Sequence, residues 1–83
     1  MARYSLDYEI LKHERTIEGD FEDSIETVYI ATVYIDDGIY GGIDLEQEEF
    51  DDVDGAKQWA RDTVKECKKR GMDYVREVYG VNI

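Results

Sequence analysis

The chain has 83 residues, a hydrophobic fraction of 42% and a formal net charge of −11, with one cysteine and one histidine. This length allows one domain, residues 1–83, with one modest core. A lone cysteine excludes an internal disulfide, and no apolar run approaches the roughly 20 residues that span a bilayer.

Two stretches near the N-terminus predict neighbouring β-strands. Residues 3–12 alternate apolar and polar side chains, as a half-buried strand does. The acidic stretch of residues 13–24 reads as a mobile connection, with the alternative that the first strand extends through Ile17. Residues 25–35, IETVYIATVYI, have β-branched and aromatic residues on both faces, which predicts a central strand covered on both sides.

The next residues predict a β-hairpin. Asp36-Asp37-Gly38 is a strong signal for a tight turn, because Asp-Gly tolerates positive φ angles. Residues 39–46 alternate again, so a third strand has one apolar face and one acidic face. Gly41-Gly42 lacks the spacing and the lysine of a phosphate-binding loop, and it predicts a bulge or a bend.

Residues 51–71 have the only clear helical period in the chain. Aspartates mark the start, where carboxylates can accept hydrogen bonds from free N–H groups, and Gly71 marks the end after three basic residues. The apolar stripe that should face the sheet contains Val53, Ala56, Trp59, Ala60, Val64 and Cys67. One flank of the helix is basic and contains Lys57, Arg61, Lys65 and Lys68.

The last segment, residues 72–83, predicts a fourth strand because it is rich in valine and contains Gly80. A short helix through Tyr74, Val75, Val78 and Tyr79 is the alternative. The expected fold is therefore α+β, with the order β-β-β-α-β and one helix on one face of a four-stranded, mainly antiparallel sheet. One helix cannot cover both faces of the central strand, so tyrosines, the acidic loop or a second copy in a homodimer must cover the other.

Catalytic and metal chemistry find little support in the sequence. His13 has no serine or cysteine placed to partner it, and two Cys or His residues in total are too few for zinc, which takes about four ligands. Aligning Gly55 with the glycine of a calcium-binding EF-hand loop puts Arg61 where a glutamate is required. We therefore expect a protein that is not an enzyme and has no cofactor and no metal site.

The acidic residues are concentrated in the middle of the chain. Residues 16–56 contain fourteen acids and no base. Such a stretch repels nucleic acid and anionic membrane and is attracted to basic protein surfaces. Solubility is the alternative explanation, because high net charge keeps a small domain dispersed.

Ten of these acids are the candidate partner-binding residues. Asp44, Glu46 and, if the third strand persists, Glu48 should form a row on one face with a repeat of about 6.6–7 Å, of the same order as the spacing of nucleic-acid phosphates. The ten candidates are Glu18, Asp20, Glu22, Asp23, Asp44, Glu46, Glu48, Glu49, Asp51 and Asp52. This row predicts binding to the basic nucleic-acid site of a partner protein.

In size, charge and element order the chain resembles phage-encoded anti-CRISPR and other anti-defence proteins. The resemblance covers the whole chain as a profile and rests on no motif, so it identifies no functional residues. It implies a viral inhibitor, acting in the host cytoplasm, that mimics DNA and occupies a basic site on a nuclease or CRISPR surveillance complex. The basic helix flank departs from a pure DNA mimic and could instead pair with acids of a second copy. A homo-oligomeric assembly module is the alternative function.

Overall fold

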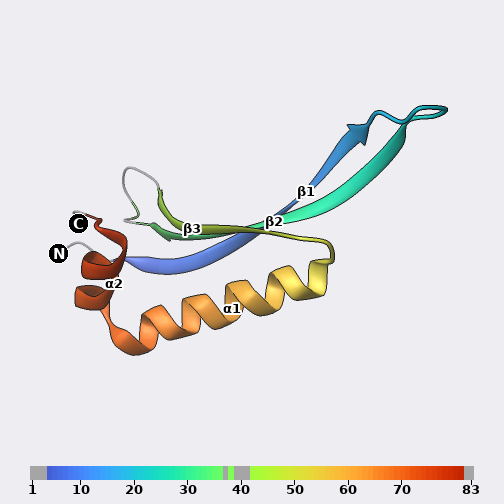
Figure 1. Cartoon of the computed structure of the whole chain (residues 1–83). Helices are drawn as coiled ribbons and strands as arrows, with labels where there is room; N and C mark the ends of the chain where they lie inside the picture. Colours follow the sequence, from blue (N-terminus) through green and yellow to red (C-terminus); the bar gives the residue numbers. More distant parts are fainter. Residues whose placement is uncertain (1–3, 37, 39–41, 82–83) are drawn as a thin grey trace.

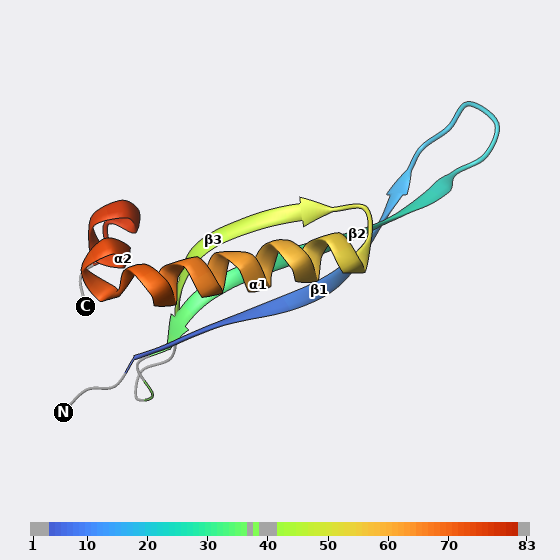
Figure 2. The ribbon, with the colours of Figure 1, turned by 90° about the horizontal axis from the view of Figure 1, so that it is seen from below.

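The computed structural model describes residues 4–36, 38 and 42–81. Three strands, β1 (Ser5–Ile17), β2 (Ser24–Asp36) and β3 (Gly42–Phe50), form one antiparallel sheet in the order β1-β2-β3. Helix α1 (Val53–Arg70) lies along one face of this sheet, and α2 (Met72–Tyr79) follows at its C-terminal end (Figures 1 and 2). The expected α+β class is confirmed. Within the described residues, no helix is both long enough and apolar enough to cross a membrane.

Helix α1 forms where its sequence period predicts. Asp52 caps the N-terminus, where its carboxylate accepts a hydrogen bond from the Gly55 backbone N–H. At the other end the Gly71 N–H donates to the Cys67 carbonyl over 3.0 Å. Gly71 has a φ of 90° with an extended ψ of 173°, so it ends the helix without the left-handed helical conformation.

The core lies between α1 and one face of β2. Ala31 and Val33 of β2 are fully buried against the helix. On the helix side, Ala56 and Ala60 are also fully buried, and their small side chains let α1 approach the sheet closely. Partly buried residues complete this layer, namely Leu6, Tyr8, Ile10, Tyr29, Leu45, Phe50 and Trp59.

The fourth strand expected over residues 72–83 is wrong, and the chain forms α2 there instead. The alternative prediction, a short helix in this segment, is the one that the structure has. Val75 of this helix is fully buried, so packing outweighs the strand preference of valine. Gly80 takes the left-handed conformation after the last turn, with a φ of 66°. The glycine that favoured a strand is thus a helix terminator. The sheet has three strands and the protein two helices in the described part of the chain.

Strands β1 and β2 are longer than β3, and this difference gives the molecule its shape. The last residue of β3, Phe50, pairs with Tyr29, and beyond this pair β1 and β2 continue as a two-stranded ribbon. The ribbon extends past the start of α1 (Figure 1). The protein therefore measures 59 × 24 × 18 Å. The alternative that the first strand extends through Ile17 is confirmed, whereas Asp37 and residues 39–41 of the expected turn and third strand lie outside the described residues.

Candidate partner-binding surface

In the described part of the chain, one face of the sheet has no helix over it (Figures 1 and 2). The register places Val28, Ile30, Thr32 and Tyr34 of β2 on this uncovered face, because the intervening residues Ala31 and Val33 face α1. Val28 and Thr32 are buried, whereas Ile30 and Tyr34 are half-buried. The central strand is thus shielded by its neighbouring strands within one chain.

A polar contact crosses the middle of the uncovered face. The Gln47 side-chain amide of β3 donates to the Thr32 hydroxyl over 3.0 Å. Thr32 is only 2% exposed, and this bond satisfies its hydroxyl. The sequence predicted apolar residues on both faces of β2, but the uncovered face has a polar centre.

Four acids surround the half-buried ring of Tyr34 on this face. Asp7 and Asp44 pair with Tyr34 from the two neighbouring strands. Glu9 follows Asp7 by two residues along β1, and Asp36 follows Tyr34 by two residues along β2, so both lie on the same face. Burial and then the negative charges of Asp7, Glu9 and Asp36 raise the pKa of the Tyr34 hydroxyl above its ordinary value. Among the described residues none of these four acids forms an ion pair.

Arg15 neutralises the acids at the other end of the uncovered face. Its guanidinium lies 2.8 Å from the Glu26 carboxylate and 3.3 Å from that of Glu49. The hydrogen bond that Arg15 donates to Glu26 and the charges of both acids raise the pKa of Arg15. Among the described residues, negative charge without a counter-ion is therefore concentrated around Tyr34, and we call Asp7, Glu9, Asp36, Asp44 and Tyr34 the acidic patch.

The expected row of Asp44, Glu46 and Glu48 on one face is wrong. Tyr34 pairs with Asp44 but Val33 pairs with Glu46, so the ladder skips Leu45 and β3 has a bulge. The extra residue moves Glu46 and Glu48 to the helix side of the sheet, whereas Asp44 stays on the uncovered face. The sequence predicted a bulge or a bend at Gly41-Gly42 and not at Leu45, and Gly41 lies outside the described residues.

Glu46 has a structural contact on the helix side. Its carboxylate accepts a hydrogen bond over 2.9 Å from the Tyr79 hydroxyl, which also lies 3.9 Å from the Cys67 sulfur. Burial is the largest cause that raises the pKa of both the Cys67 thiol and the Tyr79 hydroxyl. This small network joins β3, α1 and α2.

The other candidate acids are spread over three separate places. Glu49 pairs with Arg15, and Asp52 caps α1 beside the exposed Asp51. The remaining four lie in the exposed loop between β1 and β2, namely Glu18, Asp20, Glu22 and Asp23. The structure therefore does not bring the ten candidates together on one surface.

Sequence reasoning missed Asp7 and Glu9 as members of a surface patch. They lie in a stretch with equal numbers of acids and bases, so a count along the chain hides them. Their alternation with Leu6 and Tyr8 was the available signal, because it places them on the polar side of an edge strand.

Catalytic groups do not cluster in the described part of the chain. His13 is exposed on the ribbon opposite Val28. No group of three or more His, Cys, Asp or Glu side chains among the described residues has a geometry that could hold a metal ion. Comparison with protein families, with curated proteins and with solved structures found no match to this chain.

Proposed function

We propose that this protein is a non-enzymatic binding protein whose acidic patch occupies a basic surface on a nucleic-acid-handling partner. The observation that carries the proposal is the group of four acids around Tyr34 on a sheet face that no helix covers. A tyrosine amid charged groups suits an interface, because its ring supplies apolar contact area and its hydroxyl tolerates water. The acids supply attraction to lysine and arginine and speed the encounter.

The patch departs from the row that the sequence predicted, but it preserves the same chemistry. Asp44 belongs to both, and Asp7, Glu9 and Asp36 replace Glu46 and Glu48. In the finer form of the proposal, the protein is a phage or mobile-element inhibitor that blocks the nucleic-acid site of a host nuclease or CRISPR surveillance complex. That form rests on the resemblance in size and charge, because the element order differs from the expected one in its last element.

A symmetric dimer through the uncovered face receives no support from this arrangement. If its twofold axis passed close to Tyr34, such a dimer would bring Asp7, Glu9 and Asp44 of one copy against those of the other, which is unfavourable.

The test is capture of host proteins on the immobilised chain, followed by elution with salt and with single-stranded DNA or RNA. An electrostatic complex at a nucleic-acid site should weaken as salt rises, and the competing nucleic acid should release the partner. The double variant Asp7→Lys with Glu9→Lys should lose the partner. Glu77→Lys makes half of that charge change on the exposed surface of α2 and should retain it. A partner that nucleic acid does not displace, or that both variants retain, would refute the proposal.

A further inference from the structure

The ribbon formed by the far ends of β1 and β2 exposes large apolar side chains. Phe21, in the connecting loop, is fully exposed at 102%, and Ile25 and Ile17 in the strands that flank the loop are 71% and 47% exposed. Ile17 pairs with Ser24 and so lies on the opposite face of the ribbon from Ile25, which leaves Phe21 as the apolar group that the loop itself presents. We call residues 17–25 the arm tip.

The loop that presents Phe21 has a defined shape. A β-carbon added at Gly19 would lie 2.2 Å from the Glu22 carbonyl oxygen, so the loop closes tightly across that glycine. The acids Glu18, Asp20, Glu22 and Asp23 flank Phe21 and are exposed. The arm tip thus combines an apolar centre with a negative rim.

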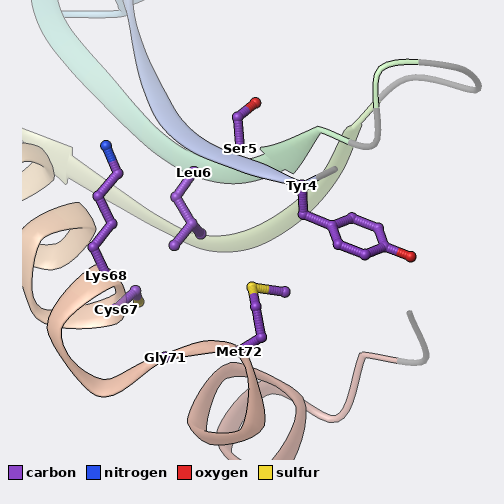
Figure 3. Close-up of a pocket in the computed structure, with 7 residues that line it drawn as sticks. All are labelled: Tyr4, Ser5, Leu6, Cys67, Lys68, Gly71 and Met72. Atoms are coloured by element: carbon purple, nitrogen blue, oxygen red, sulfur yellow. The ribbon is translucent and has the colours of Figure 1, made fainter. Parts of the chain in front are cut away.

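The opposite end of the molecule carries a groove of complementary chemistry between β1 and α1. Two adjoining hollows of about 410 and 360 Å³ share Leu6 and Lys68 as lining residues. Figure 3 shows Leu6 and Met72 directed into the space between the strand and the helices, with Cys67 beside it. The groove is therefore apolar at its floor.

The wall of this groove is basic. It includes Arg61, Lys65 and Lys68 from the flank of α1, and all three are exposed. Arg61 donates to the Tyr8 hydroxyl over 3.3 Å, whereas neither Lys65 nor Lys68 forms an ion pair within the described residues. A ligand that suits this groove has an apolar group with anions around it.

We propose that the groove binds the arm tip of a second copy of the same chain, with Phe21 on the apolar floor and the acids of the loop against Lys65 and Lys68. The arm tip and the groove lie at opposite ends of the long molecule (Figures 1 and 2). Two antiparallel copies side by side therefore place each arm tip near the other copy's groove. The contact is reciprocal and closes as a twofold dimer.

Strand β1 favours this arrangement because it lies at the edge of the sheet and runs between the two sites. Its outer edge has no partner strand in the described part of the chain, and long unpaired edges are usually covered in native proteins. Asp7 of the acidic patch also lines this groove, whereas Glu9, Tyr34, Asp36 and Asp44 do not. The variants that test the dimer leave the whole acidic patch unchanged, so a dimer and the binding function proposed above can fail independently of one another.

Sedimentation equilibrium with two charge-exchanged variants tests the proposal at 0.15 M salt, where the Debye length is about 8 Å. The arm variant carries Asp20→Lys and Glu22→Lys, and the groove variant carries Lys65→Glu and Lys68→Glu. Each variant alone should stay near the monomer mass of 9.7 kDa, because like charges then meet at both contacts. An equimolar mixture should recover twice that mass, since opposite charges meet at both contacts of the mixed dimer.

Two further variants address Phe21 without risk to the core. Phe21→Ala should weaken the dimer about thirtyfold if this ring is the anchor of the contact. Gly19→Ala should also weaken it, because the loop must change shape. A wild-type chain that stays at 9.7 kDa across the concentration range, or a mixture that fails to recover the dimer, would overturn the proposal. Masses well above the dimer would overturn the closed twofold form.

Discussion

Replacement of Trp59 by alanine tests how the helix is held on the sheet. Trp59 is partly buried against the core, and its ring centroid lies 5.7 Å from that of Phe50 with an interplanar angle of 47°. Removing a fully buried Trp or Phe side chain costs about 3–5 kcal/mol. Because Trp59 keeps part of its surface in water, we expect Trp59→Ala to lower the free energy of unfolding by about 2–3 kcal/mol.

The assay is urea unfolding followed by far-ultraviolet circular dichroism, because the substitution removes the only tryptophan. With a slope of about 1 kcal/mol per molar urea, typical of the low end for small domains, the midpoint should fall by roughly 2–3 M. Gln58→Ala, at an exposed neighbouring position, is the control and should change stability by less than about 0.5 kcal/mol.

A double-mutant cycle with Phe50→Ala separates the ring contact from simple burial. Aromatic pairs contribute about 0.5–1.5 kcal/mol beyond burial, so we expect a coupling energy in that range. The reasoning fails if Trp59→Ala is as mild as the control, because Trp59 would then contribute nothing to packing. A coupling energy near zero would refute the ring contact alone.

Three further predictions concern the network of Glu46, Tyr79 and Cys67. Glu46→Lys should destabilise the fold by about 1–3 kcal/mol because the Tyr79 hydroxyl loses its acceptor, whereas Glu48→Lys should cost less than about 0.5 kcal/mol in the same urea assay; equal costs would contradict the contact between Glu46 and Tyr79. Tyrosine in the unfolded chain ionises near pH 10, but burial and the bond to Glu46 raise the pKa of folded Tyr79, so stability should fall above about pH 10. Tyr79→Phe should make that fall shallower, and parallel stability curves would exclude this cause. Burial raises the pKa of Cys67, so a thiol reagent should label it slowly in the native state and rapidly in urea, and fast native labelling would show that the thiol is accessible.

The sequence predicted most of the fold wherever one periodicity was strong. The apolar stripe and both end signals located α1 to within two residues, and the run of β-branched residues located β2. Residues 72–79 were mistaken for a strand because valine favours strands locally, whereas the burial of Val75 depends on contacts with the rest of the fold.

The candidate site was predicted less well because it depends on register. One extra residue at Leu45 reverses the side of every later residue in β3, and local composition does not reveal such a bulge. The acidic patch is assembled from three strands, so the spacing along any one strand could not locate it.

The unequal strand lengths imply that backbone amides exchange their hydrogens through two different openings, local fraying of the ribbon and global unfolding of the rest. From His13 outward, the β1–β2 ladder in the described structure has neither a third strand nor α1 beside it, and isolated two-stranded hairpins are only marginally stable in water. Amides from His13 to Thr27 should therefore exchange through local fraying that leaves the rest of the sheet intact. Amides of Ala31 and Val33 should exchange only on global unfolding. The bridge from Arg15 to Glu26 and Glu49 lies at the border between these two regions, so it sets how far the fraying extends.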